Sequence, residues 1–151
     1  MPSDSSSDEI RLTASGGPAG RFTLCLRQDL LWITAEGEPT GQDLVTCFHR
    51  AQDAGWLEPN MRTLVDMARF TGVVEWSAIH AIKQMAPWGT GPGAAPRTAY
   101  LARDNLTGMI VKILSFLFPR TRHRVFFNET EALAWLRAPD APPAATKPEL
   151  A

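Results

Sequence analysis

Histidines, cysteines and carboxylates are the side chains of this 151-residue chain that could bind a metal or move a proton. His49, His80 and His123 fall in three separate parts of the chain, with no metal-ligand spacing between them. Cys25 and Cys47 are too far apart for a redox C-x-x-C pair, and we interpret them as reduced thiols in a cytosolic protein. The sequence therefore predicts no catalytic residues, no metal and no cofactor, and we expect a protein that is not an enzyme.

Two aspartates follow predicted strands, where α/β folds place their polar sites. Asp66 lies at the carboxyl end of the apolar run 62–67, and Asp104 follows the predicted strand 97–102. Each also has a structural interpretation: Asp66 accepts backbone N–H groups of the following loop, and Asp104 caps the next helix together with Asn105. Both aspartates are candidates for a polar site at the strand ends, with the structural role as the alternative.

Hydrophobic periodicity predicts the elements that must position these residues. The expected order is β-β-α-β-α-β-α-β-α, which implies a mixed α/β sheet, with about five strands and with helices mainly on one face. Thr40, followed three residues later by Asp43, resembles an N-cap of the first helix. Asn128 is expected to cap the last helix, with Glu131 as its capping-box partner. The predicted strands are 22–27, 30–35, 62–67, 97–102 and 122–127, and the predicted helices are 40–55, 75–85, 105–118 and 128–136.

The two ends of the chain differ from this regular part in composition. Residues 1–20 are rich in Ser, Gly, Pro and Asp, and residues 138–151 in Pro and Ala, which predicts disordered tails on either side of one domain at 21–137. The N-terminus has no apolar signal segment, and the longest apolar run, 109–118, is too short to span a bilayer. We therefore expect a cytoplasmic protein without stable membrane insertion.

A short basic run occupies residues 119–124 in a chain whose formal net charge is −1. Strand alternation places Arg122 and Arg124 on one side with Phe126, whereas His123 lies elsewhere. The charges therefore do not converge, and the run lacks interleaved stacking aromatics. The sequence predicts a solvated junction between a loop and a strand, and no nucleic-acid partner.

The predicted helix 105–118 carries more apolar surface than one sheet can cover. Such surplus surface marks a homodimer contact, a partner face or one wall of a lipid-sized pocket. The alternative is that neighbouring loops simply cover this face of the helix. The candidate interface or pocket residues are Trp88, in the loop before the strand 97–102, and Met109, Val111, Phe116 and Phe118 on the helix itself.

Three segments carry a family resemblance: Leu64-Val65-Asp66, Ala99-Tyr100-Leu101-Ala102, and Arg124-Val125-Phe126 leading into residues 131–136. Together with the order of elements, they resemble the bacterial SpoIIAA-like family over roughly residues 22–136. The resemblance implies the STAS-like fold, which is related in architecture to the CRAL-TRIO lipid-transfer domain.

The resemblance also implies a position for a phosphorylation switch. Anti-sigma-factor antagonists carry an Asp-Ser-Ser-Gly-like sequence at the start of the helix after the third strand, where a phosphate resets a partner interface. The corresponding stretch here is Glu75-Trp76-Ser77-Ala78, in which only Ser77 keeps a hydroxyl. Ser77 is the candidate switch residue and Thr71, in the preceding loop, is a second. The alternative is that Ser77 is a first-turn serine that satisfies backbone amides.

We expect a non-enzymatic regulatory or protein-interaction module that binds a protein partner or self-associates, as a homodimer for example. The alternative function is the binding of a small hydrophobic ligand or lipid in an apolar pocket beside the predicted helix 105–118. A concave cavity would favour the ligand, and a flat exposed patch would favour the partner.

Overall fold

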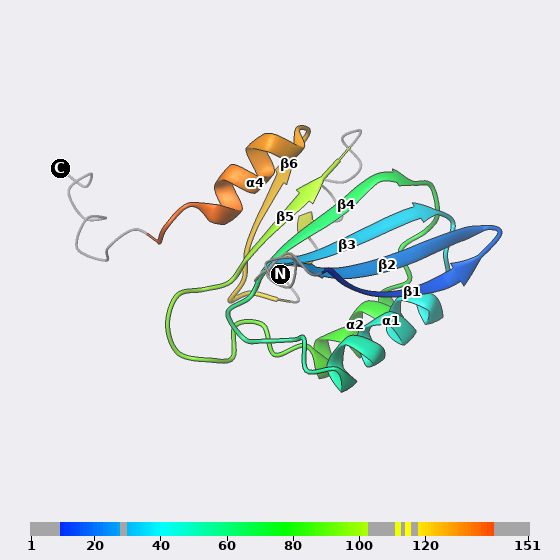
Figure 1. Cartoon of the computed structure of the whole chain (residues 1–151), viewed down its shortest axis with the longest axis horizontal. Helices are drawn as coiled ribbons and strands as arrows, with labels where there is room; N and C mark the ends of the chain where they lie inside the picture. The colour runs from blue at the N-terminus through cyan, green and yellow to red at the C-terminus, as the bar shows by residue number, and fades with distance from the viewer. Residues whose placement is uncertain (1–9, 28–29, 103–110, 113, 116–117, 141–151) are drawn as a thin grey trace, which may run out of the picture.

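The computed structural model describes residues 10–27, 30–102, 111–112, 114–115 and 118–140. In this part of the chain, six strands form one sheet whose order follows the sequence (Figure 1). Strands β1 to β3 pair antiparallel, and β3 to β6 pair parallel. The predicted mixed α/β fold is confirmed, with six strands in place of about five. The strands are β1 (Ile10–Gly17), β2 (Gly20–Arg27), β3 (Leu30–Gly37), β4 (Arg62–Phe70), β5 (Arg97–Leu101) and β6 (Arg122–Phe126).

Strand β1 corrects the predicted N-terminal boundary of the domain. It pairs antiparallel with β2 along its whole length. The Arg50 guanidinium also donates a hydrogen bond to the Ala14 carbonyl oxygen at 2.7 Å. The prediction of a disordered segment over residues 1–20 is therefore wrong for residues 10–20. A strand at a sheet edge is held by backbone pairing and needs little apolar burial, and Leu12 is indeed 63% exposed.

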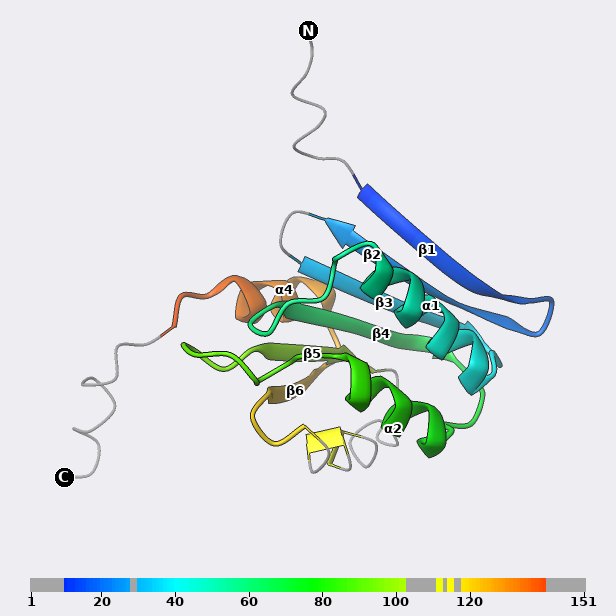
Figure 2. The same ribbon diagram turned by 90° about the horizontal axis from the view of Figure 1, so that it is seen from below.

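Helices cover both faces of the sheet. Helices α1 (Gly41–Asp53) and α2 (Trp76–Met85) lie side by side on one face, and α4 (Glu129–Arg137) lies on the other (Figure 2). Residues 111–112 and 114–115 are also helical. The sequence predicted helices mainly on one face, and α4 is the exception. No helix of the described residues is long and apolar enough to cross a membrane.

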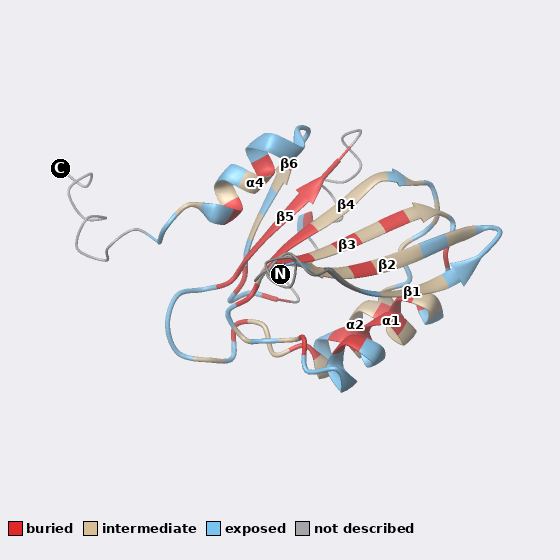
Figure 3. Cartoon of the chain, in the orientation of Figure 1, coloured by how far each residue is buried: buried red, intermediate tan, exposed pale blue. Residues whose placement is uncertain are grey.

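Strand alternation divides the apolar side chains into two cores, because successive side chains point to opposite faces of a sheet. The core under α1 and α2 includes Leu31 of β3 and Phe48 of α1. The core under α4 includes Leu64, Ala99 and Leu136. Figure 3 shows buried residues along the whole of β5, which is consistent with a central strand that is covered on both faces.

Two helix starts were predicted correctly from local sequence. Thr40 forms a capping box with Asp43: its hydroxyl oxygen accepts from the Asp43 N–H at 3.1 Å, and its own N–H donates to the Asp43 carboxylate at 2.9 Å. The Asn128 side-chain oxygen accepts from the Glu131 N–H at 3.0 Å, but the Glu131 side chain does not return the bond to the Asn128 N–H, so the cap forms without the predicted capping box. Both caps satisfy backbone donors that a helix leaves free in its first turn.

Arg97, at the start of β5, is only 3% exposed although it is charged. Its guanidinium donates to the carbonyl oxygens of Trp135 and Ala138 at 2.7 Å and to the Asp140 carboxylate at 2.9 Å. Arg62 also donates to Ala138, at 2.9 Å, and pairs with Asp140. The two arginines therefore satisfy the carbonyl groups that α4 leaves free at its C-terminal end.

These bonds also move the C-terminal boundary of the domain. The prediction of a disordered tail over residues 138–151 is wrong for residues 138–140, which are held against the two arginines. Composition did not predict this, because the contacts are made by backbone carbonyls and one carboxylate and not by apolar side chains. Residues 1–9 and 141–151 lie outside the described residues.

Candidate functional site

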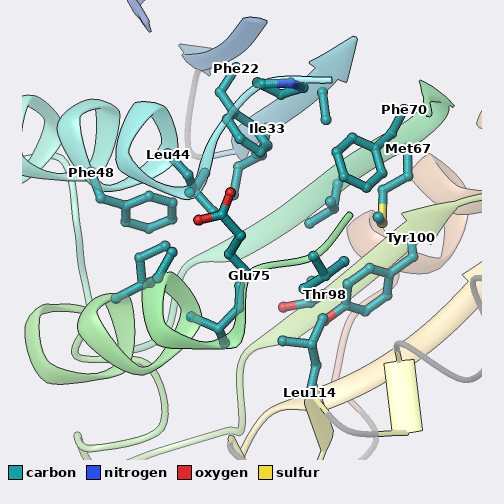
Figure 4. A pocket seen from close by; sticks show the side chains of 18 of the residues that line it. Phe22, Ile33, Leu44, Phe48, Met67, Phe70, Glu75, Thr98, Tyr100 and Leu114 are labelled. Carbon is teal, nitrogen blue, oxygen red and sulfur yellow. The ribbon is translucent and has the colours of Figure 1, made fainter. Parts of the chain in front are cut away.

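An apolar cavity of about 120 Å³ lies between the sheet and the helices α1 and α2, and we call it the sheet–helix cavity (Figure 4). Strands β2 to β6 contribute to its lining, as do both helices. The cavity is therefore built on the rigid elements of the fold, and its lining residues come from segments that are far apart in the sequence. Its apolar walls include Phe22, Ile33 and Val65 from the sheet and Leu44, Phe48 and Ile82 from the helices.

Small residues line this space among the larger apolar ones. Ala35 on β3 and Ala78 on α2 are both buried and both line the cavity. Gly41, the first residue of α1, also lines it, and a Cβ at this position would lie 2.8 Å from the Ala78 Cβ and 2.8 Å from the Glu75 Oε1. The absence of a side chain on Gly41 therefore allows the N-terminal ends of α1 and α2 to approach each other closely.

Tyr100 and His123 form a polar end of the sheet–helix cavity. The Tyr100 hydroxyl and His123 Nδ1 are 2.8 Å apart, and His123 Nε2 lies 3.1 Å from the Phe118 carbonyl oxygen. Because a carbonyl oxygen only accepts, Nε2 carries the hydrogen, and in the neutral imidazole Nδ1 then accepts from the Tyr100 hydroxyl. Thr98, two residues before Tyr100 on the same face of β5, also lines the cavity.

Burial keeps the two groups of this polar end neutral. Desolvation lowers the pKa of His123 below its ordinary value of 6.5, and the hydrogen bond to Phe118 opposes this effect only in part. Desolvation also raises the pKa of the Tyr100 hydroxyl well above its ordinary value of 10.0. The pair therefore offers hydrogen bonding without charge at neutral pH.

The exposed lining residues mark the mouth of the cavity. Val73 is 80% exposed, and Glu75 is exposed as well. Glu75 occupies the N-cap position of α2, but its side chain does not bond to the first turn of that helix. Figure 4 shows its carboxylate turned toward Leu44 of α1. A carboxylate thus stands at the entrance to an apolar space.

Two of the residues predicted for an apolar interface or pocket line the sheet–helix cavity. Trp88 and Phe118 are both part of its wall, and their ring centroids are 5.6 Å apart. Val111 is buried but does not line the cavity. Met109 and Phe116 lie outside the described residues.

Most of the cavity lining was not predicted from the sequence. The expected pocket lay beside residues 105–118, whereas the observed cavity is lined mainly by strands β2 to β6 and helices α1 and α2. In a sequence, an apolar residue that lines a cavity has the same pattern as one that fills a core. The available signals were the small residues Ala35 and Ala78 at core-facing positions, and the polar residues Thr98 and Tyr100 on a fully buried strand.

The two candidate switch residues lie near the mouth of the cavity. Ser77 is exposed in the first turn of α2, two residues after Glu75. Thr71 is exposed just after β4, and its backbone N–H donates to the Gly37 carbonyl oxygen at 2.9 Å. Neither residue is among the described residues that line the cavity. Their role as switches stays a prediction.

Asp66 does not lie at a strand end, so its predicted position is wrong. Strand β4 continues past it to Phe70, through an irregularity in its pairing with β3. The Asp66 carboxylate accepts the Ala68 N–H at 3.1 Å, so it bonds to the backbone as the alternative predicted, but within the strand and not in a following loop. Asp104, the second aspartate of the predicted polar site, lies outside the described residues.

The charges of the basic run do not converge, as strand alternation predicted. The guanidinium of Arg122 lies over the Trp135 ring at 5.8 Å, and that of Arg124 lies over the Phe126 ring at 5.2 Å. His123 instead faces the sheet–helix cavity on the other side of β6. The arginines therefore cover aromatic rings on the α4 side of the sheet.

Both cysteines are free thiols. Burial raises the pKa of Cys47 to about 11 and raises the pKa of Cys25 above its ordinary value of 9.0. The thiolate is the nucleophilic form, so neither cysteine is activated at neutral pH. Within the described ranges, no three His, Cys, Asp or Glu side chains come together in a way that could hold a metal ion.

Comparison with known proteins places this architecture in a family. A family model described as SpoIIAA-like matches residues 30–137. The chain belongs to the SpoIIAA-like family. Strands β1 and β2 of this SpoIIAA-like protein precede the matched residues, yet Phe22 of β2 lines the cavity.

A solved structure supports the SpoIIAA-like fold over most of the chain. It is the crystal structure of an uncharacterized protein of the DUF3478 family with a SpoIIAA-like fold from Shewanella loihica PV-4. The two structures superpose with a TM-score of 0.53 at 18% sequence identity, over 84% of this chain and 93% of the other. At this identity the similarity concerns the fold alone. No curated protein matches the chain.

Proposed function

We propose that this SpoIIAA-like domain is a non-enzymatic regulatory module that binds a small apolar ligand in the sheet–helix cavity. The observation that carries the proposal is the cavity itself, about 120 Å³ of space with an almost wholly apolar lining. Protein interiors are close-packed, and voids larger than a water molecule are few. A space of this size and lining, with a mouth at Val73 and Glu75, is suited to an apolar group that enters from solvent.

The volume of the cavity limits the size of the buried group. An engineered apolar cavity of about 150 Å³ stays dry and binds benzene. The sheet–helix cavity, at about 120 Å³, is slightly smaller. We therefore expect it to hold one ring or a chain segment of about six carbons. Empty volume destabilises a core by about 24 cal/mol per Å³, so filling this cavity would recover up to about 3 kcal/mol.

The residues at the mouth support the regulatory part of the proposal. Val73 exposes 80% of its surface beside the entrance, so a protein partner that contacts residues 71–75 would also contact the ligand's point of entry. Ser77 is exposed at the start of α2, where a phosphate would add about two negative charges close to the Glu75 carboxylate. Ligand binding and phosphorylation would then act on the same partner surface. Self-association as a homodimer would use a surface of this kind as well.

Toluene binding in solution tests the ligand proposal directly. We expect toluene to shift the NMR resonances of Ala35, Ala78 and Tyr100, which line the cavity. Ala35→Val should weaken toluene binding at least about tenfold because it fills part of the space. Ala99→Val is the matched control, since it adds the same two methyl groups to the core under α4 and should leave the toluene affinity unchanged. Wild-type protein whose cavity resonances do not move at millimolar toluene would refute the proposal.

Native mass spectrometry of protein purified without denaturation tests the same proposal with the natural ligand. A retained compound would appear as an added mass that Ala35→Val loses and Ala99→Val keeps. The same spectrum separates monomer from homodimer, so it also measures self-association. A retained compound that survives in Ala35→Val would place the ligand outside the cavity.

A further inference from the structure

Both polar hydrogens of the Tyr100–His123 pair, at the polar end of the sheet–helix cavity, already take part in hydrogen bonds. Tyr100 donates its hydroxyl hydrogen to His123 Nδ1, over 2.8 Å. His123 donates its N–H, at Nε2, to the Phe118 carbonyl oxygen, over 3.1 Å. The Tyr100 oxygen keeps a lone pair after it has donated its hydrogen. Toward the cavity, this pair therefore presents an acceptor and no donor.

Thr98 adds a second hydroxyl to the same wall. Thr98 is 5% exposed and lines the cavity two residues before Tyr100 on β5. A threonine hydroxyl can donate as well as accept. A ligand hydroxyl can thus donate to Tyr100 and accept from Thr98, whereas an ether oxygen can only accept and an aliphatic group can do neither.

The charges around the cavity narrow the ligand class further. The described residues that line it include neither Lys nor Arg, and the Glu75 carboxylate lies at the mouth. Burying an anion without a cationic partner is strongly unfavourable. A carboxylate or phosphate would also pass the like charge of Glu75 on entry. The cavity therefore disfavours anionic ligands both at its mouth and inside.

We propose that the sheet–helix cavity selects neutral hydroxyl compounds, that is, phenols or alcohols whose buried part has about six carbons, and that Tyr100 accepts the ligand's hydroxyl hydrogen. This selectivity rests on the proposed ligand-binding function and names the class of its ligand. It separates this ligand class from fatty acids and acyl phosphates, which share the apolar part but carry an anionic end.

A panel of small ring compounds tests the proposal on the full chain at neutral pH. Toluene measures binding to the apolar cavity alone, phenol adds a hydroxyl, anisole adds an oxygen that can only accept, and benzoate adds an anion. We expect benzoate to bind at least about a hundredfold more weakly than phenol. The affinities are measured by NMR titration or calorimetry.

Variants of the polar end isolate the role of Tyr100. In Tyr100→Phe/His123→Leu, the ratio of phenol affinity to toluene affinity should fall about fivefold, as expected for one lost hydrogen bond. In His123→Leu alone, the Tyr100 hydrogen is released, so anisole affinity should rise relative to toluene affinity. Thr98→Val is the matched control: it keeps the side-chain volume, and the phenol advantage that depends on Tyr100 should persist.

The results of these titrations distinguish a failure of the hydroxyl selectivity from a failure of the proposed ligand binding. If toluene does not bind the wild-type protein, the ligand-binding function itself fails. If toluene binds but the phenol-to-toluene ratio is the same in wild type and in the double variant, Tyr100 does not accept the ligand hydrogen. Benzoate binding as tight as phenol binding would overturn the preference for neutral ligands. That comparison needs only the wild-type chain, so it holds even where a variant does not fold.

Discussion

Ala35→Val should stabilise this protein, although most substitutions in a packed core destabilise. Ala35 is 3% exposed and lines the sheet–helix cavity from β3. Burying two additional carbons contributes about 1.6 kcal/mol, at about 0.8 kcal/mol each. Ordering the valine side chain costs about 0.5 kcal/mol. We therefore expect an increase of about 1 kcal/mol in the free energy of unfolding, helped by the preference of β-branched residues for strands.

Urea unfolding measures this change, and the midpoint of thermal unfolding should rise by about 3–5 °C. Ala99→Val is the matched control on the opposite face of the sheet. Ala99 is fully buried in the core under α4, where additional methyl groups meet packed neighbours. Overpacking of this kind costs about 1–3 kcal/mol. The same chemical change should therefore have opposite signs at the two positions.

The two alanines also define the results that would refute this reasoning. If Ala35→Val and Ala99→Val destabilise to the same extent, the space beside Ala35 is filled by side chains in solution, and the ligand proposal loses its basis. If Ala35→Val stabilises the protein but binds toluene as tightly as wild type, the cavity exists and toluene binds elsewhere.

Three further predictions concern groups outside the apolar lining or at its polar end. Burial lowers the pKa of His123 below 6.5, so between the folded pKa and 6.5 the unfolded chain binds a proton that the folded chain does not. The free energy of unfolding should therefore decrease as the pH falls from 6.5 to the folded pKa of His123. His123→Gln should reduce this pH dependence, as measured by urea unfolding at a series of pH values. Asn128→Ala removes the acceptor for the Glu131 N–H and should cost about 1 kcal/mol in the same assay, whereas an unchanged midpoint would show that the α4 cap contributes nothing. The Cys47 thiol, with a pKa of about 11, should react with a thiol reagent at neutral pH about a hundredfold more slowly than a thiol with a pKa of about 9. Equal reaction rates of Cys47 in folded and in urea-unfolded protein would contradict its burial.

Features that depend on neighbours in the sequence were predicted well. The capping box of Thr40 and Asp43 and the Asn128 cap are local patterns, and both occur in the structure. The order of the described strands and helices from residue 22 onward follows from hydrophobic periodicity, which reflects the buried face of each element. The predicted helix 105–118 lies mostly outside the described residues. These predictions needed no information about which segments meet in space.

Features that depend on distant segments were predicted poorly. Strand β1 alternates three apolar residues with polar ones before two glycines, and it is held by its pairing with β2, which composition does not report. Asp66 was expected at a strand end because the apolar run stops there, but β4 continues by pairing with β3 beyond that point. The sheet–helix cavity combines side chains of β2 to β6 with α1 and α2, and no single segment carries its pattern.

The anchoring of α1 gives a physical reason for the cavity to stay open. A core relaxes inward when space is left in it, unless its elements are held from outside. Arg50 of α1 donates to the Ala14 carbonyl oxygen of β1 at 2.7 Å, and the Asp43 carboxylate accepts from the Ser15 hydroxyl of the same strand at 3.4 Å. These bonds hold α1 to the edge of the sheet and oppose its movement toward Ala35. Strand β1, which precedes the residues matched to the family, thus helps to keep the sheet–helix cavity open.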